Sequence, residues 1–124
     1  MPGLEIESKL LHMLSMSRKA GKLLLGFDSV REGLAGGRVF AAFVSASASQ
    51  KTQKEVEFFS KKYRVPFMRL QIPAEVLRRF TGREAAVMGI SDKNFAEKIL
   101  SLAGDFQQYL AVSNSDFGGL SIDN

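Results

Sequence analysis

The segment VFAAFVSA, residues 39–46, constrains the fold more than any other stretch, because it is apolar on both faces of an extended chain. Such a strand is buried on both sides, which requires helices above and below its sheet and is typical of parallel sheets. The segment therefore predicts a central, buried strand in a layered α/β domain.

Three further apolar segments and five segments of helical periodicity alternate along the chain. The other expected strands are KLLL (22–25), VPFMRL (65–70) and AAVMGI (85–90). A helix that included KLLL would have to run through Gly21 and Gly26, which disfavour it. Strict alternation of strands and helices predicts a three-layer α/β/α sandwich around a small, mostly parallel sheet.

The expected helices are delimited by capping residues and by glycines. Ser, Thr, Asp and Asn side chains accept hydrogen bonds from the first turn of a helix, whereas Gly commonly ends one. The expected start signals of the five helices are Ser8, Asp28 or Ser29, Thr52 with Glu55, Pro73, and Asp92. The expected stop signals are Gly21, Gly36 with Gly37, and Gly82.

The chain is long enough to bury one core and needs no second domain. It has 124 residues, of which 45% are hydrophobic. We expect a single domain over residues 1–108. Beyond it the helical periodicity is lost, and SNSDFGGLSIDN is rich in Ser, Gly, Asn and Asp. This composition predicts a flexible, acidic C-terminal tail over residues 109–124.

Composition also predicts the compartment. The chain contains no cysteine, which excludes a disulfide framework and thiolate zinc sites. The start MPGLEIESKL lacks the apolar core of a signal peptide, and the apolar runs are too short to span a bilayer. We therefore expect a reduced, cytoplasmic protein with no membrane partner.

The charge is distributed unevenly. Every Lys and Arg precedes Gly104, and the stretch from Asp105 onward carries three Asp and no basic residue, so the formal charge without that stretch rises from +4 to +7. A basic domain of this kind favours a polyanionic partner such as nucleic acid. Excess lysine is also an ordinary solubility device, and the charge alone leaves both interpretations open.

Glycine and positive charge coincide in SRKAGKLLLGFDSVREGLAGGR, residues 17–38. Gly26 lies just before a helix whose first N–H groups can attract phosphate. Three cations are close in sequence: Arg18, Lys19 and Lys22. In the alternative interpretation the glycines only make tight turns, while Arg18 and Lys19 offset the dipole at a helix C-terminus.

The same stretch carries a family resemblance. KAGK at residues 19–22, followed by Gly26 and by Val30 one turn later, resembles the L-seven-Ae/L-thirty-e family of ribosomal and kink-turn RNA-binding proteins. Within that family it is most similar to the bacterial YlxQ-like branch. The resemblance covers residues 8–103, and YRVPFMRL and TGREAAVMGISDKNFAEKIL continue it in the expected order.

The resemblance implies both a fold and a function. The fold is an L-thirty-e-like α/β/α sandwich with a four-stranded mixed sheet. The function is binding of structured, kink-turn-like RNA, such as ribosomal RNA, in a ribosome- or translation-associated role. It implies no cofactor and no small-molecule substrate, and we expect a monomer.

Members of the family bind sharply bent RNA with two regions. By position the first region is Gly26, Phe27, Asp28, Ser29 and Arg31, and the second is Arg83, Glu84, Ala85 and Ala86. Arg79, beside Arg78, adds positive charge next to the second region. Two alternatives stay open: Phe27 either stacks on a base or fastens its helix to the core, and Arg78 with Arg79 either contacts RNA or forms a solvated helix face.

The match fails at informative positions. Kink-turn binders of this family carry two basic residues before the glycine, then an Asn-Glu pair and a Lys one turn later. This chain has Leu24, Leu25, Asp28, Ser29 and Glu32 there. Asp cannot donate a hydrogen bond as Asn does, and Glu repels phosphate where Lys attracts it. A protein-interaction scaffold with weakened RNA binding is therefore the alternative function.

The sequence does not predict an enzyme. His12, the single histidine, lies within an expected helix with no nucleophile or acid motif beside it, which favours a partly buried structural role. SASAS at residues 45–49 follows a strand end, but it matches no nucleophile elbow, Walker motif or dinucleotide fingerprint. No metal-ligand spacing is present, so we expect no metal site.

Overall fold

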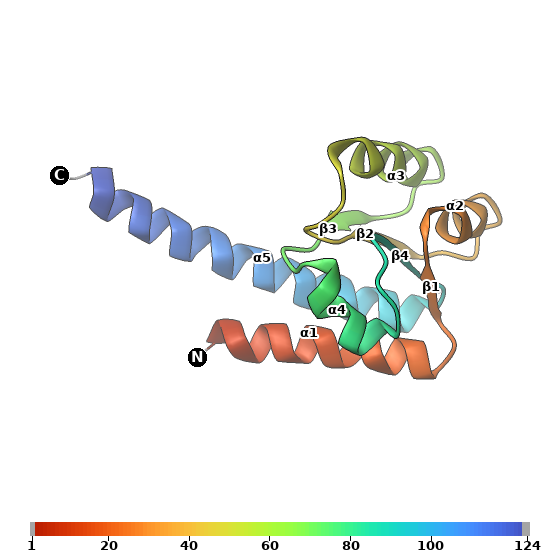
Figure 1. The fold of residues 1–124 in the computed structure, drawn as a ribbon, viewed down its shortest axis with the longest axis horizontal. Coiled ribbons are helices and arrows are strands. Elements are labelled where there is room, and N and C mark those ends of the chain that lie inside the picture. Colours follow the sequence, from red (N-terminus) through yellow and green to blue (C-terminus); the bar gives the residue numbers. More distant parts are fainter. Residues whose placement is uncertain (1, 123–124) are drawn as a thin grey trace.

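Helices and strands alternate along the chain as expected. The computed structural model describes the backbone of residues 2–122 and the side chains of residues 3–112. The elements are α1 (Pro2–Lys19), β1 (Leu23–Leu25), α2 (Phe27–Ala35), β2 (Ala41–Val44), α3 (Gln50–Lys62), β3 (Phe67–Arg69), α4 (Ala74–Thr81), β4 (Val87–Ile90) and α5 (Lys93–Ile122). Figure 1 shows the sheet between α2 and α3 on one side and α1, α4 and α5 on the other, so the predicted three layers are confirmed.

The sheet is mixed, with strand order β1-β4-β2-β3. Only β2 and β3 are parallel, whereas β4 runs antiparallel to both β1 and β2. The mostly parallel sheet predicted from alternation was wrong, and the mixed sheet implied by the family resemblance is confirmed. Alternation does not set strand direction: the chain leaves β3 at one edge of the sheet and returns through α4 to insert β4 between β1 and β2.

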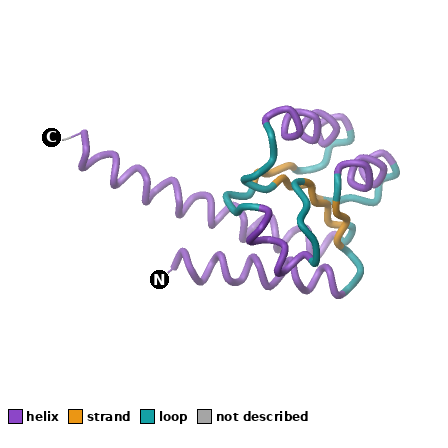
Figure 2. Tube along the Cα trace, viewed as in Figure 1, coloured by secondary structure: helices purple, strands orange, loops and turns teal. Residues whose placement is uncertain are grey.

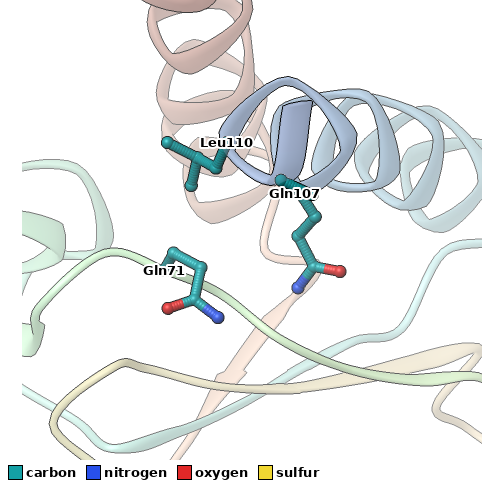
Figure 3. A pocket seen from close by; sticks show the side chains of 4 residues that line it. Gln71, Gln107 and Leu110 are labelled. Carbon is teal, nitrogen blue, oxygen red and sulfur yellow. The ribbon is translucent and has the colours of Figure 1, made fainter. Parts of the chain in front are cut away.

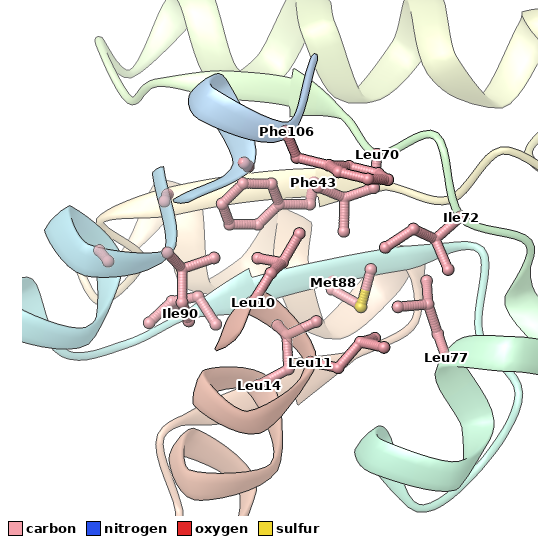
Figure 4. Packing of buried hydrophobic residues seen from close by; sticks show 14 residues of the cluster. Leu10, Leu11, Leu14, Phe43, Leu70, Ile72, Leu77, Met88, Ile90 and Phe106 are labelled. Atoms are coloured by element: carbon pink, nitrogen blue, oxygen red, sulfur yellow. The ribbon is translucent and has the colours of Figure 1, made fainter. Parts of the chain in front are cut away.

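The central strand β2 divides the core into two clusters, because successive side chains of a strand point to opposite faces. Phe43 faces α1 and α5 and packs in the cluster with Leu14 and Ile99, shown in Figure 4. Its neighbour Val44 belongs to the cluster beneath α2 and α3. All four residues of β2 are buried, which confirms the strand that VFAAFVSA predicted.

Three helix starts differ from the expected ones. α1 begins at Pro2 rather than at Ser8. The N-cap of α2 is Gly26, and neither Asp28 nor Ser29 caps it. The N-cap of α3 is Ser49, whose hydroxyl accepts a hydrogen bond from the Thr52 N–H at 3.1 Å. Each expectation rested on a polar residue that lies inside its helix, where residue type alone does not distinguish it from a cap.

The cap of α5 is confirmed, but its end is not where the sequence placed it. Asp92 accepts a hydrogen bond from the Phe95 N–H at 2.8 Å. The helix then continues to Ile122, and Figures 1 and 2 show it projecting beyond the rest of the molecule. The loss of helical structure expected from residue 109 was therefore wrong for the backbone. The division into a domain and a separate tail remains a prediction.

The first residues of this extension pack on α1. Leu110 lies against the cluster that contains Leu10 and Leu14. A Cβ atom on Gly3 would overlap the Tyr109 ring, so the two helices approach closely there. In the part of the chain that the structure describes, no helix is long and apolar enough to cross a membrane.

Candidate nucleic-acid interface

Gly26 lies where the two predicted contact regions meet. Its N–H donates a hydrogen bond of 2.9 Å to the carbonyl of Val87, which directly follows the second region, residues 83–86. The backbone of Gly26 has φ 97° and ψ 152°, a conformation that is essentially restricted to glycine. The fold therefore brings residues 26–31 and 83–86 together at one edge of the sheet.

Arg83 bridges the two regions directly. Its Nη2 donates a hydrogen bond of 2.9 Å to the Leu25 carbonyl, 58 positions away in the chain. The same nitrogen lies 3.7 Å from the place where a Cβ on Gly26 would be. The buried Thr81 hydroxyl lies 3.1 Å from the Arg83 carbonyl and holds the backbone of the loop. The Arg83 side chain is thus exposed but positioned.

Arg18 joins this group from the last turn of α1. A Cβ on Gly82 would fall 2.6 Å from the Arg18 Nε, so the guanidinium lies directly over that glycine. Gly82 is the C-cap of α4, as expected, with φ 96°. From the sequence Gly82 was predicted only as a helix stop, and its close approach to Arg18 was not predicted.

The N-terminus of α2 has no side-chain cap. The Gly26 carbonyl accepts the Val30 N–H at 3.1 Å, and the three amides between them precede the first helical hydrogen bond. These amides, together with the positive end of the helix dipole, favour an anion at this position. They belong to Phe27, Asp28 and Ser29.

The first turn of α2 is organised by Phe27 and Arg31. The Phe27 ring packs edge-on against Phe59 of α3, with centroids 6.2 Å apart, and contacts the core cluster beneath α2 and α3. This contact favours the fastening role of Phe27 over stacking on a base. The Arg31 guanidinium lies 5.6 Å from the Phe27 ring centroid. It also lies 3.9 Å from Asp28, an exposed pair of little energetic weight.

The other predicted site residues lie farther from Gly26 or contribute through their backbone. The Lys22 carbonyl accepts the Ser91 N–H, which places Lys22 at the opposite end of β1, about 13 Å from Gly26 along the strand. Lys19, the last residue of α1, is exposed. The Ala86 carbonyl pairs with the Ser45 N–H at 2.9 Å. The remaining positions are Arg79 and Glu84, which are exposed, and Ala85, which is half-buried.

The single histidine lies on the surface, in a shallow pocket that Ser8, Lys9, Met13 and Leu102 also line. His12 is exposed, so the expectation of a partly buried histidine was wrong, because its helix position faces away from Leu11 and Leu14. The pocket in Figure 3 is lined by Gln71, Gln107, Leu110 and Ala111 and contains no titratable side chain. Among the residues that the structure describes, no group of three His, Cys, Asp or Glu could hold a metal ion.

The class of protein follows from this architecture. A four-stranded mixed sheet in the order β1-β4-β2-β3, between two helices and three, is the L-thirty-e-like α/β fold. No family model matches the chain. Two relatives do: the RNA-binding protein YlxQ of Enterococcus faecium is 31% identical over 94 residues, and that of Bacillus subtilis is 32% identical over 91. The matches cover 76% and 73% of this chain and 90% of each relative.

Solved structures agree with the fold. A protein of unknown function from Bacillus halodurans has a TM-score of 0.74 at 27% identity, covering 77% of this chain and 97% of its own. The Giardia lamblia 15.5kD RNA binding protein has a TM-score of 0.68 at 13% identity, covering 84% of this chain and 89% of its own. The chain belongs to the YlxQ branch of the L-seven-Ae/L-thirty-e family.

Proposed function

We propose that this protein binds structured RNA through the surface formed by Arg18, residues 26–31 and residues 82–86, called the junction face below. The observation that carries the proposal is the Arg83 side chain, which connects the two regions by its hydrogen bond to the Leu25 carbonyl. The names of the two YlxQ relatives as RNA-binding proteins support it.

The junction face offers the groups that bind a phosphate backbone. The uncapped amides of α2 supply neutral donors, while Arg18 and Arg83 supply exposed charged donors beside them. Contacts to phosphate set affinity and register, and contacts to bases set specificity. Donors that come from two different loops suit a bent RNA, whose backbone can meet both loops at once.

The kink-turn-like target and the ribosome- or translation-associated role in the cytoplasm are finer parts of the proposal. Leu24 and Leu25 stand where kink-turn binders have basic residues, and both are half-buried in β1. Ser29 and Glu32 are exposed on α2 and available to RNA. We expect weaker and less selective kink-turn binding than in relatives with the full motif.

The first test compares three alanine substitutions in a titration with structured RNA at several salt concentrations. Arg83→Ala should weaken binding and reduce the slope of log affinity against log salt by one contact, roughly 0.7 to 0.9. Lys22→Ala should have a smaller effect, because Lys22 lies at the far end of β1. Lys98→Ala, an exposed cation on α5 outside the junction face, is the control and should change little.

A slope unchanged by Arg83→Ala would contradict the assignment of this face. No detectable binding to any structured RNA at low salt would favour the alternative, a protein-interaction scaffold of the same fold.

The second test concerns kink-turn recognition. The double substitution Ser29→Glu with Glu32→Lys should strengthen binding to a kink-turn RNA more than binding to a straight duplex of matched length. Lys at position 32 replaces repulsion of phosphate with attraction, and Glu at position 29 can accept a hydrogen bond from a base amino group. Equal gains on both RNAs would mean that only non-specific charge had been added, and the kink-turn proposal would fail.

A further inference from the structure

α3 exposes a phenylalanine on the side opposite the core. Phe58 is 62% exposed. At about 100° per residue it points away from both Val56 and Ser60, the two buried residues of that helix. A single exposed apolar side chain is ordinary, but Phe58 is surrounded by lysines.

Lysines flank Phe58 at helical spacing on both sides. Lys54 and Lys61 lie one turn before and one turn after it, and all three line one shallow depression together with Glu57. Residues three or four apart are neighbours on a helix surface, so Lys62 adjoins Phe58 and Lys51 extends the row by one more turn. Lys51, Lys54, Phe58, Lys61 and Lys62 are all exposed and form what is called the α3 stripe below.

Aromatic contacts connect the α3 stripe to the junction face. The Phe58 ring packs edge-on against Phe59, with centroids 5.2 Å apart. Phe59 in turn contacts Phe27, at 6.2 Å, and Arg31 lies over that ring. Three phenylalanines therefore lead from the first turn of α2 to the lysine row on α3, and Figure 1 shows these two helices side by side on the same face of the sheet.

We propose that the α3 stripe binds a single-stranded RNA segment that continues from the structured element on the junction face. Single-stranded nucleic acid is bound by a basic surface that follows its backbone and by aromatic rings on which bases stack. The stripe supplies both, with Phe58 as the stacking ring and the lysines as phosphate contacts. The link to a structured element rests on the proposed function, whereas contact with a single strand can be measured alone.

The composition of the stripe favours RNA over a membrane or an apolar protein groove. An interfacial helix buries a broad apolar face in lipid, and a protein interface has an apolar core depleted of lysine. Phe58 is the one large hydrophobic side chain of α3 that is more than a third exposed in the described structure. One ring between cations suits a stacked base and a phosphate backbone.

The test uses a kink-turn RNA with and without an eight-nucleotide uridine tail, and the uridine oligonucleotide alone at low salt. The tail should raise wild-type affinity at least about fivefold, the lower end of what one stacked base contributes. Phe58→Ala should abolish this gain and leave affinity for the untailed RNA unchanged. Phe58→Tyr should keep the gain. The control is Phe40→Ala, which removes a ring 41% exposed on the loop before β2 and should have no effect.

A tail carrying 5-iodouridine should crosslink to Phe58 and not to Phe40. A tail gain that persists in Phe58→Ala, or that Phe40→Ala removes equally, would overturn the proposal. Phe58-dependent binding to phosphatidylserine vesicles without any tail effect would replace it with a membrane surface.

Arg83→Ala separates this proposal from the proposed function. It should weaken binding to the untailed RNA while leaving the uridine oligonucleotide bound in a Phe58-dependent way. If Arg83→Ala weakens binding to neither RNA, and oligonucleotide binding still depends on Phe58, then the α3 stripe binds RNA and the junction face does not. If Arg83→Ala weakens binding to the untailed RNA while Phe58→Ala changes neither the tail gain nor oligonucleotide binding, the stripe is rejected and the junction face is retained.

Discussion

Gly26 permits a quantitative test of the junction face. Its φ of 97° and ψ of 152° lie in a region that L side chains almost never adopt. Space is not limiting, because the nearest atom to an added Cβ is the Arg83 Nη2, at an ordinary 3.7 Å. Gly26→Ala therefore measures backbone strain rather than a steric clash.

We expect Gly26→Ala to lower the free energy of unfolding by about 1–3 kcal/mol, the cost of holding a residue in such a region. The matched control is Gly104→Ala in α5, where an added Cβ meets nothing within 4 Å and no positive φ is present. Alanine is favoured over glycine inside a helix by roughly 0.5–1 kcal/mol, so this control should stabilise the protein. The same substitution should thus have opposite signs at the two sites.

Urea denaturation followed by circular dichroism measures both changes, and an unaltered m value shows that the unfolding transition is comparable. In a titration with structured RNA, Gly26→Ala should bind more weakly than the wild type, because the strained backbone displaces the uncapped amides of α2. Gly104→Ala should bind as the wild type does. If Gly26→Ala unfolds at the same urea concentration as Gly104→Ala, the positive φ of Gly26 is not required and the reasoning fails.

Two further predictions concern stability. Ser49→Ala should destabilise the protein by about 0.5–2 kcal/mol, because it removes the cap of α3, whereas Thr52→Ala should cost less; the reverse order in denaturation curves would restore Thr52 as the cap. Deleting residues 113–124 should preserve cooperative unfolding. Deleting residues 109–124 should lower the melting temperature below that of the shorter deletion, because it removes Leu110, which packs on the α1 side of the core. Equal melting temperatures for the two truncations would show that this contact adds no stability.

The apolar and helical patterns predicted every element of the fold, but not the direction of its strands, which only the family resemblance implied. The apolar pattern of residues 39–46 reports burial on both faces, and β2 is buried as predicted. The same pattern carries no information about whether the neighbouring strands run parallel or antiparallel. That choice depends on where the chain re-enters the sheet after α4, which is a long-range property.

The site was predictable in part. Gly26 was predicted to lie just before a helix and Gly82 to end one, and both have positive φ. The contact of Arg18 with Gly82 was not predictable, because it depends on how α1 packs against α4 rather than on local spacing. Lys22 shows the opposite error: four residues from Gly26 in sequence, it is separated from it by the length of β1, because an extended strand carries neighbours apart faster than a helix does.

The uncapped start of α2 links the fold to the proposed function. A serine or aspartate at the N-cap would satisfy one of the free amides, yet the chain has Gly26 there, and the conformation it adopts also allows Arg83 to reach the Leu25 carbonyl. Replacing a polar cap by glycine costs only a few tenths of a kcal/mol, so the helix forms without its cap. A phosphate bound at these amides would then act as the missing cap. Because a ligand that binds only the folded state stabilises it, RNA bound at this position would strengthen the first turn of α2 as it is recognised, and the stability of that turn and the affinity for RNA would be set by the same hydrogen bonds.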